Sequence, residues 1–179
     1  VSYCALCDGN FFRNQTVAVV GGGNAALEES LYLSKLVSKL YLIHRRDEFR
    51  ARKIYQDKLT EQSDKITLLR SSVVTALHGE KELTGLTVKN LKSGEETLLP
   101  VNGLFVYVGF SPSTGFLPAD LAKDEQGFII TDTEMRTNIP GIFAAGDIRS
   151  KLCRQVITAA GDGATAAQAA FVLMEQLHA

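Results

Sequence analysis

Apolar residues follow two different periods near the start of the chain. Residues 16–20 form a β-branched apolar run, typical of a strand that is buried on both faces. A glycine-rich stretch at 21–26 interrupts this run. Over residues 27–36, leucines recur at helical spacing among charged side chains. The pattern therefore predicts a strand, a glycine turn and a helix in direct succession.

More strands and one further helix follow this unit. Short apolar runs predict strands at 39–43, 66–69 and 103–109, and an amphipathic pattern predicts a helix at 51–63. Residues 72–101 alternate in short stretches separated by turn signals, which predicts an antiparallel meander. Its strands are predicted at 73–77, 86–91 and 97–99. We predict an α/β fold, a Rossmann-like dinucleotide-binding domain with a β-meander crossover.

The last third of the chain has a different pattern. Strands are predicted at 127–131 and 142–145, a turn at 137–141 and a long alanine-rich helix at 154–177. Proline and serine cluster near residue 112, which indicates a domain boundary there. We expect a short segment at 1–9 leading into the dinucleotide-binding domain at 10–112, and a strand and helix piece of a second domain at 113–179.

Composition narrows the classes of function. Of the 179 residues, 45% are hydrophobic and 22% are charged, with a formal net charge of -1, so nothing indicates disorder or a basic surface for nucleic acid. No apolar run is expected to span a membrane, and the first residues lack a signal-peptide pattern. We therefore expect a soluble, cytoplasmic protein that binds neither nucleic acid nor membrane. Its three cysteines do not form the framework of a secreted disulfide scaffold.

The glycine stretch fits the formula G-x-G-x-x-A of a dinucleotide-binding turn. Gly21 would allow the tight turn, Gly23 would let the backbone approach a pyrophosphate, and Ala26 would let the helix lie close to the strand. The first amide groups of the helix would then face an anion. The formula recurs from Gly161 to Ala166, but it follows no strand there, and we expect no site at that position.

The end of the second strand carries basic residues where an NAD-binding fold carries an acidic one. His44, Arg45 and Arg46 follow the strand directly, and Arg50 comes shortly after. Planar, permanently charged guanidinium groups suit a 2′-phosphate, which favours NADP over NAD. The alternative is a solvated loop in which Asp47 and Glu48 neutralise the arginines.

The chain opens with Cys4-x-x-Cys7, the spacing of a redox-active disulfide. Half of a zinc site is the alternative, but the histidines and Cys153 show no metal-ligand spacing, and we expect no metal. Asp8 is a turn residue, a proton donor to a leaving thiolate, or both. We predict that Cys153 is a buried structural thiol.

Two more polar or flexible positions follow predicted strands. Gly109 is a candidate wall of the nucleotide crevice, because it ends the strand that returns beside the glycine turn. Asp147 could hydrogen-bond the sugar-like hydroxyls of a cofactor, or it could cap the next helix. The sequence leaves both roles of Asp147 open.

Five motifs occur in an order and at spacings that are typical of a known family. They are C-A-L-C-D-G, V-V-G-G-G-N-A-A-L-E-E, H-R-R-D-E-F-R, I-P-G-I-F-A-A-G-D and C-R-Q-V. Together they closely resemble the bacterial-type low-molecular-weight thioredoxin reductases, from Tyr3 to Leu177. A redox C-x-x-C directly before an NADP fold is characteristic of that family.

The resemblance implies a mechanism. NADPH would pass a hydride to FAD, reduced flavin would reduce a disulfide between Cys4 and Cys7, and the dithiol would reduce a thioredoxin-like protein. Cys7 would be the thiol next to the flavin, and Cys4 would attack the partner. Asp8 would protonate the departing thiolate.

The resemblance also implies a homodimer, a redox-motif segment at 1–9, an NADPH-binding domain at 10–112, the C-terminal portion of an FAD-binding domain at 113–179, and a set of cofactor contacts. The pyrophosphate of NADPH would lie on Gly21, Gly23, Asn24 and Ala25, and its 2′-phosphate on His44, Arg45, Arg46 and Arg50. Glu28 would lie near the nicotinamide, and FAD would contact Asp147, Arg154, Gln155 and Val156.

The sequence departs from this family in one respect. A complete member begins with a separate strand and G-x-G-x-x-G turn for the ADP half of FAD, and none precedes Cys4 here. The resemblance therefore implies a fragment, or one half of a two-chain assembly, that binds NADPH and holds FAD weakly or not at all. Two alternatives stay open: the related flavoprotein that reduces a peroxiredoxin, and a non-catalytic NADP-binding module whose cysteines are structural.

Overall fold

The computed structural model describes residues 1–61 and 64–178 and divides the chain into two compact units. The first unit is Val1–Gly109 and the second is Phe110–Ala179. The helix predicted at 51–63 extends over residues 62 and 63, which lie outside the described residues.

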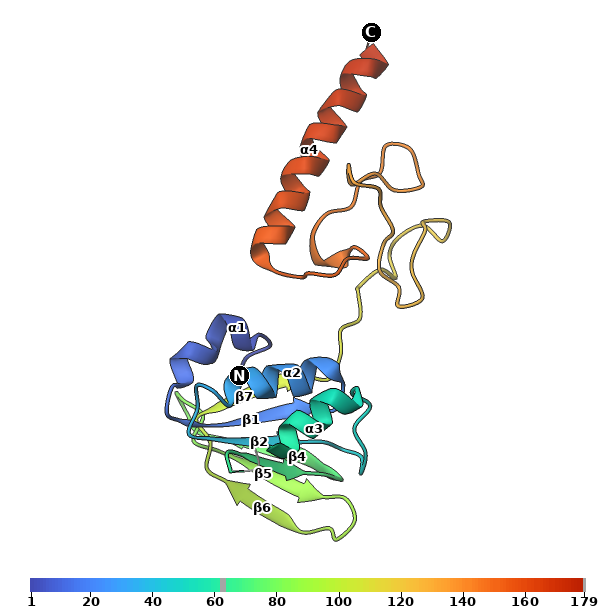
Figure 1. Cartoon of the computed structure of the whole chain (residues 1–179). Coiled ribbons are helices and arrows are strands. Elements are labelled where there is room, and N and C mark those ends of the chain that lie inside the picture. Colours follow the sequence, from blue (N-terminus) through green and yellow to red (C-terminus); the bar gives the residue numbers. More distant parts are fainter. Residues whose placement is uncertain (62–63, 179) are drawn as a thin grey trace. The chain divides into compact units, whose positions relative to one another are not determined.

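A parallel four-stranded sheet forms the centre of the first unit (Figure 1). Its strands are β1 (Thr16–Gly21), β2 (Lys39–Ile43), β3 (Ile66–Leu69) and β7 (Gly103–Tyr107), in the order β3-β2-β1-β7. The carboxyl ends of all four strands therefore meet at one edge of the sheet. The chain runs from β1 outward to β3 and then returns to β7 on the other side of β1, so the order reverses beside β1. Nucleotides bind at such a reversal in open α/β sheets.

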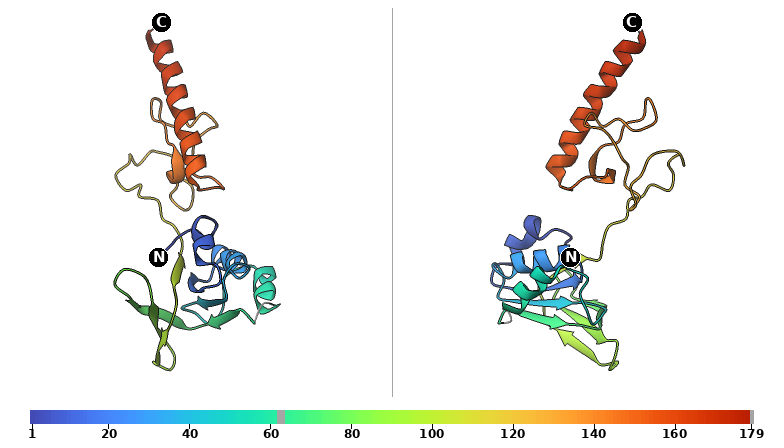
Figure 2. Two further views of the ribbon diagram at one scale, coloured as in Figure 1. Left: turned by 90° about the vertical axis from the view of Figure 1, so that its left-hand side faces the viewer. Right: turned by 45° about the vertical axis from the view of Figure 1, so that its right-hand side comes forward.

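Helices α2 (Asn24–Leu33) and α3 (Lys53–Glu61) cover one face of this sheet. The other face packs on an antiparallel sheet of β4 (Ser72–His78), β5 (Gly85–Asn90) and β6 (Glu96–Leu99). In Figure 2 the helices and the antiparallel strands lie on opposite sides of the parallel strands.

Alternation along β1 explains why both faces of the parallel sheet are apolar. Val17 and Val19 pack in the helix-side core, whereas Ala18 packs in the core shared with the antiparallel sheet. All three side chains are fully buried. Burial on both faces is what favours a continuous apolar run over a polar and apolar alternation.

The sequence pattern located the elements of the first unit well. All seven of its predicted strands are present among the described residues, and their ends shift by two residues at most. A feature that the pattern did not predict is the short helix α1 (Ala5–Asp8), which continues into the 3-10 helix η1 (Gly9–Phe12). The ring of Phe12 anchors this segment, because it contacts Phe105 edge-on and lies where a side chain at Gly103 would be.

The second unit contains the 3-10 helix η2 (Gly146–Ile148) and the long helix α4 (Val156–His178). Its small core comprises Leu121, Ile129 and Ala144, with partly buried neighbours. The turn predicted at 137–141 is present.

The strands predicted at 127–131 and 142–145 are wrong. Ile129 and Phe143 make only isolated β-bridges, and neither segment forms a strand in the described part of the unit. Ile130 and Ile142 are exposed, so these segments are not the buried runs that the pattern suggested.

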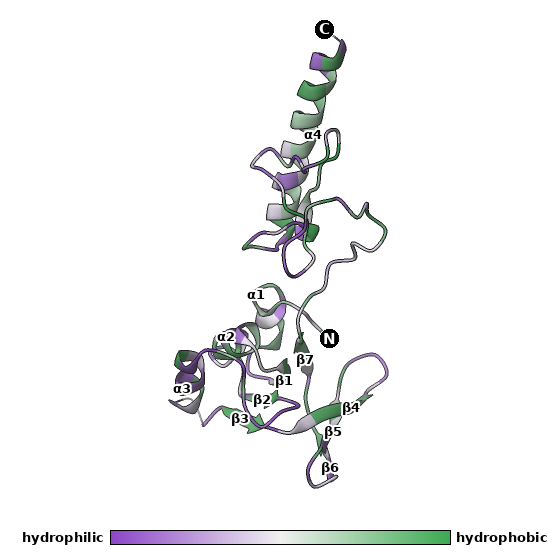
Figure 3. Ribbon diagram, turned by 90° about the vertical axis from the view of Figure 1, so that its right-hand side faces the viewer, coloured by the Kyte–Doolittle hydropathy of each residue, from purple (hydrophilic) through white to green (hydrophobic). Residues whose placement is uncertain are grey.

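One helix among the described residues meets the length and composition of a membrane-spanning segment, which the pattern of continuous apolar runs did not predict. Helix α4 is 23 residues long with a mean hydropathy of 1.3 over its most apolar stretch, which is enough to cross a bilayer on those two criteria alone. Figure 3 shows hydrophobic colour along the C-terminal part of α4. Buried core helices of soluble proteins pass the same two criteria, whereas little of the apolar stretch of α4 is buried within this chain.

Candidate functional site

The glycine turn lies at the carboxyl edge of the parallel sheet, between β1 and α2. Gly21 has a φ of +154°, and a Cβ atom there would lie 2.5 Å from the backbone oxygen of Tyr107 and 2.7 Å from the Cβ of Ala26. Only glycine fits this position. The fully buried Ala26 lets α2 start directly against the end of β1.

Gly23 is glycine for a different reason. A Cβ atom there would meet nothing within 4 Å, so the packing of this chain does not require a bare backbone. Gly23 is also the N-cap of α2, and no side-chain hydrogen bond caps the helix in the described structure. The open space and the first amides of α2, at Asn24 and Ala25, are suited to the pyrophosphate of a dinucleotide.

His44 lies beneath the glycine turn. A Cβ atom on Gly22 would be 2.1–2.6 Å from the imidazole ring, so Gly22 leaves the room that the ring occupies. The ring stacks on Phe49, and its Nε2 lies 3.0 Å from the carbonyl oxygen of Glu48. Burial lowers the pKa of His44, the bond to the Glu48 carbonyl raises it, and nearby arginines lower it. A phosphate contact by His44 stays a prediction, since this buried ring instead supports the turn.

Backbone hydrogen bonds join the glycine turn to the loop that carries the arginines. The amides of Arg50 and Ala51 donate to the carbonyl oxygen of Gly22, at 2.8 and 3.2 Å. The amide of Arg52 donates to Oδ1 of Asn24, at 2.9 Å. The two predicted phosphate-binding segments therefore form one connected structure.

The arginines of this loop are available to a ligand. Arg45, Arg46 and Arg50 are exposed, and none has a salt bridge to a described residue. Asp47 instead pairs with Lys92 and accepts a hydrogen bond from Ser71, and these two contacts lower the pKa of Asp47. The solvated-loop alternative required Asp47 and Glu48 to neutralise the arginines, but neither carboxylate forms a salt bridge with an arginine of this loop in the described structure.

The two cysteines at the start of the chain form a disulfide. Cys4 and Cys7 are bonded to each other with Cα atoms 5.3 Å apart, so their sulfurs are not arranged as zinc ligands. Cys4 is also the N-cap of α1, and its sulfur accepts a hydrogen bond from the Cys7 amide at 3.2 Å. Cys7 is exposed, whereas Cys4 is half-buried.

Ser2 ties this redox segment to the edge strand β7. Its amide donates to the oxygen of Leu104, and its own oxygen accepts from the amide of Val106. Its hydroxyl accepts from the Cys4 amide at 3.1 Å and donates to Oδ2 of Asp8 at 2.7 Å. Sequence reasoning missed Ser2, because its contacts with β7 span about a hundred residues.

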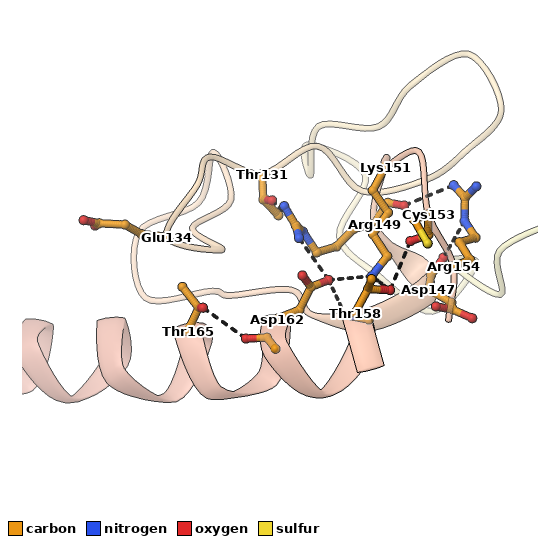
Figure 4. Close-up of polar contacts among 12 residues, drawn as sticks. Thr131, Glu134, Asp147, Arg149, Lys151, Cys153, Arg154, Thr158, Asp162 and Thr165 are labelled. Carbon is orange, nitrogen blue, oxygen red and sulfur yellow. Dashed lines mark hydrogen bonds and ion pairs between the residues drawn. The ribbon is translucent and has the colours of Figure 1, made fainter. Parts of the chain in front are cut away.

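The residues predicted to contact FAD lie together in the second unit, around η2 and the start of α4 (Figure 4). The guanidinium of Arg154 donates to the backbone oxygens of Asp147 and Arg149, at 3.2 Å each, and lies 3.9 Å from the ring centroid of Phe128. Asp147 is exposed, which suits a carboxylate that would accept hydrogen bonds from hydroxyl groups. Gln155 precedes α4, and Val156 is its exposed first residue.

Asp162 organises this part of the chain, and sequence reasoning missed it. Its Oδ2 accepts from the side chains of Arg149 at 3.0 Å and Lys151 at 2.8 Å, and from the amide of Gly146 at 3.1 Å (Figure 4). These hydrogen bonds, led by that of Lys151, lower the pKa of Asp162 to about 2. An isolated carboxylate among alanines and glycines was the available signal.

The remaining predicted positions have mixed outcomes. Gly109 follows β7 with a φ of +109°, and Glu28 is exposed on α2, hydrogen-bonded to Tyr55. The second glycine formula lies inside α4 and forms no turn, as expected. The prediction of a buried thiol at Cys153 is wrong, because this free cysteine is exposed in the loop before α4.

Comparison with known proteins now decides the family. The family model of pyridine nucleotide-disulphide oxidoreductases matches residues 2–163. The chain belongs to this family. Because the match covers both the glycine turn and the disulfide, the pyridine nucleotide-disulphide oxidoreductase fold accounts for both features in one chain.

The similar proteins within this family are thioredoxin reductases. The chain is 47% identical to one from Listeria monocytogenes over 99% of its own length and 56% of the relative, and 48% identical to one from Treponema pallidum over 99% and 57%. The crystal structure of a Streptococcus pyogenes thioredoxin reductase matches with a TM-score of 0.91 and 45% identity, covering 98% of this chain and 57% of that one. The chain spans little more than half the length of these relatives.

A first prediction concerns His44 and acid stability. Because the folded-state pKa of His44 is lowered, the unfolded chain binds a proton more readily than the folded one, so stability should fall as pH drops through about 6.5. In the variant His44→Gln, the stability should change less with pH over this range. Near-UV circular dichroism can follow unfolding of the first unit, which contains all five tyrosines. His78→Gln is the control. If stability depended on pH as weakly in His78→Gln as in His44→Gln, the prediction would be contradicted.

A second prediction concerns the arginines. Replacing both Arg45 and Arg46 by alanine should weaken NADPH binding by about 10- to 100-fold, the value of a charge-assisted contact, and leave NADH binding within about twofold. Isothermal titration calorimetry of the purified chain measures the affinities for NADPH and for NADH. Arg13→Ala removes an exposed arginine that bonds Asn10 and serves as the control. Equal weakening of NADPH and NADH would show that the arginines do not recognise the 2′-phosphate.

A third prediction concerns Asp162. Asp162→Asn should lower the local opening free energy of the first turns of α4 by roughly 1–3 kcal/mol, because Arg149 and Lys151 lose a charged acceptor. Amide hydrogen exchange measures this opening. Glu175→Gln, an exposed neutralisation on the same helix, should leave exchange unchanged. If the amides in the first turns of α4 exchanged equally slowly in Asp162→Asn and in the unaltered chain, Asp162 would not stabilise the start of this helix.

Proposed function

We propose that this chain is part of an NADPH-dependent flavoprotein disulfide reductase whose Cys4/Cys7 dithiol reduces thioredoxin or a thioredoxin-like protein. The observation that carries the proposal is a disulfide tied to strand β7, in the same unit as a glycine turn with exposed arginines. The names of the relatives, thioredoxin reductases, support it.

In this proposal NADPH supplies a hydride and FAD carries its two electrons to the disulfide. The chain's own residues bind and orient NADPH. Gly21 and Gly23 shape the turn for the pyrophosphate, and Arg45 and Arg46 neutralise the 2′-phosphate. His44 holds the turn and the arginine loop at a fixed separation. Glu28 is exposed on α2 for a contact near the nicotinamide.

Reduction of the protein partner is a thiol–disulfide exchange. The Cys4 thiolate attacks one sulfur of the partner's disulfide and forms a mixed disulfide, and the departing partner thiolate takes up a proton. The Cys7 thiolate then attacks the sulfur of Cys4, which restores the Cys4–Cys7 disulfide and releases the second partner thiolate to be protonated. Two electrons pass to the partner. Asp8, held by Ser2, is the proposed proton donor.

Three further properties belong to the same proposal. Asp147, Arg154, Gln155 and Val156 would contribute to an FAD site together with polypeptide that the longer relatives contain. We propose a homodimer, for which the exposed apolar residues Phe171, Met174 and Leu177 of α4 offer a surface. A cytoplasmic location suits a redox dithiol that must be kept in exchange with other thiols.

The fourth prediction tests the order of attack. In a Cys153→Ser background, the reduced Cys7→Ser variant should form a mixed disulfide with oxidised thioredoxin, because Cys4 attacks and this chain keeps no thiol to resolve the adduct. Acid quenching traps the adduct before the released partner thiol reverses the attack. The matched Cys4→Ser variant should form several-fold less. Non-reducing gel electrophoresis and intact mass measure the adduct.

Alkylation of the Cys153→Ser chain gives the companion control. Cys4 and Cys7 should both become reactive only after mild reduction, as expected of an accessible redox disulfide. Adducts of equal yield from both single-cysteine variants would contradict the assigned order. A disulfide that resists mild reduction would favour a non-catalytic nucleotide-binding module.

A further inference from the structure

Two half-buried titratable residues lie beside the redox helix α1, and none of the assigned roles uses them. Glu29 lies on α2, which contacts both α1 and β7, and Tyr107 is the last residue of β7. The hydroxyl of Tyr107 donates a hydrogen bond to the carboxylate of Glu29. The two residues therefore link α2 and β7 at the place where α1 packs (Figure 1).

Tyr107 also holds the backbone next to the disulfide. The amide of Ala5 donates to the Tyr107 hydroxyl oxygen at 2.7 Å. This amide belongs to the peptide bond that joins Cys4 to Ala5, and Ala5 is fully buried. The hydroxyl thus restrains the residue that carries one of the two sulfurs.

The position of Glu29 lowers the stability of the fold, because one of its carboxylate oxygens is removed from water without a hydrogen bond to a described residue. Its Oε2 is buried and has no hydrogen-bond partner among the described residues. Burial raises the pKa of Glu29, the Tyr107 hydroxyl and the Ala5 amide lower it, and Glu28 raises it. A glutamine would keep a hydrogen bond to Tyr107 without burying a charge, so stability alone does not account for a carboxylate here.

We propose that Tyr107 and Glu29 are positioning residues for the dithiol, holding the Cys4–Ala5 peptide so that the two cysteines stay at disulfide spacing. Glu29 accepts the hydroxyl hydrogen of Tyr107, which turns the oxygen lone pairs toward the Ala5 amide. The inference rests on the proposed function, because a redox role is what gives this spacing its use.

The consequence is a shift in a redox equilibrium. Exchange with a reference dithiol moves two electrons and two protons: the Cys4–Cys7 bond breaks, both sulfurs gain hydrogen, and the reference thiols are oxidised to a disulfide. A restrained Cys4 loses less freedom when the disulfide forms. Removing the restraint should therefore favour the dithiol.

The proton on Glu29 should modulate this effect. The charged groups that face the pair are Glu28 on α2 and Asp8 on α1, and both are acidic. An ionised Glu29 makes the stronger bond to Tyr107 and, through it, a stronger bond to the Ala5 amide. As pH falls through the raised pKa of Glu29, the carboxylate gains a proton and the restraint on Cys4 weakens. The equilibrium then shifts toward the dithiol by more than protonation of the cysteine thiols alone would cause.

The test is the equilibrium of the Cys4–Cys7 disulfide with dithiothreitol in the purified chain, read by mass-tag alkylation without NADPH, FAD or thioredoxin. Tyr107→Phe should shift the equilibrium toward the dithiol by about three- to tenfold, the size of one hydrogen bond. Glu29→Gln should lose the extra pH dependence. Tyr41→Phe on β2 and Glu96→Gln on β6 are matched controls that should leave the equilibrium unchanged.

Folding is checked separately, by near-UV circular dichroism and by exchange of the Ala5 amide. If Tyr107→Phe does not fold, the pH profile of Glu29→Gln alone decides the proposal. An unshifted equilibrium in folded Tyr107→Phe, a shift of equal size in Tyr41→Phe, or an unchanged pH profile in Glu29→Gln would overturn it. Because no cofactor or partner is present, failure of the proposed function would instead appear in the thioredoxin adduct experiment.

Discussion

The candidate nucleotide site depends on the carbonyl oxygen of Gly22. This oxygen accepts hydrogen bonds from the amides of Arg50 and Ala51, so the glycine turn and the loop that presents the arginines cannot move independently. His44 fills the space under the same residue. Charged side chains on a flexible loop would lose conformational entropy when a phosphate bound. Fixing their backbone beforehand reduces that loss.

Tyr107 connects the nucleotide-binding part of the first unit to the redox part. Its backbone oxygen approaches Gly21 so closely that no side chain fits there, and its hydroxyl holds the amide of Ala5 beside Cys4. Ser2 adds a second attachment to the same strand. The end of β7 therefore supports the turn and the disulfide through different atoms of one residue and its neighbours. A change in the packing of β7 would therefore affect both the glycine turn and the disulfide.

Local patterns predicted this unit well, because its strands are buried on both faces and its turn follows a formula with a physical basis. The exposure of the arginines fits the same kind of rule, whereas their selection of the cofactor stays a prediction. The contacts of Ser2, Glu29 and Tyr107 could not be predicted from the sequence. Their roles arise from hydrogen bonds between residues distant in sequence, which no spacing rule encodes. The contact between Gly22 and His44 was missed because the formula leaves that glycine unspecified.

The second unit shows where pattern reasoning fails. A short apolar run around Ile129 looked like a strand, but strand formation depends on a partner ladder, and only single bridges form there. Cys153 was expected to be buried on residue type alone, yet its loop is held at the surface by contacts of Arg154 and Thr158 with backbone oxygens. Asp162 is the opposite case, a charge in an apolar helix that pairs with the buried Arg149 and the half-buried Lys151. An ion network of this kind fixes α4 to its own loops while leaving most of the helix exposed, which is the arrangement expected of an element that packs against further polypeptide.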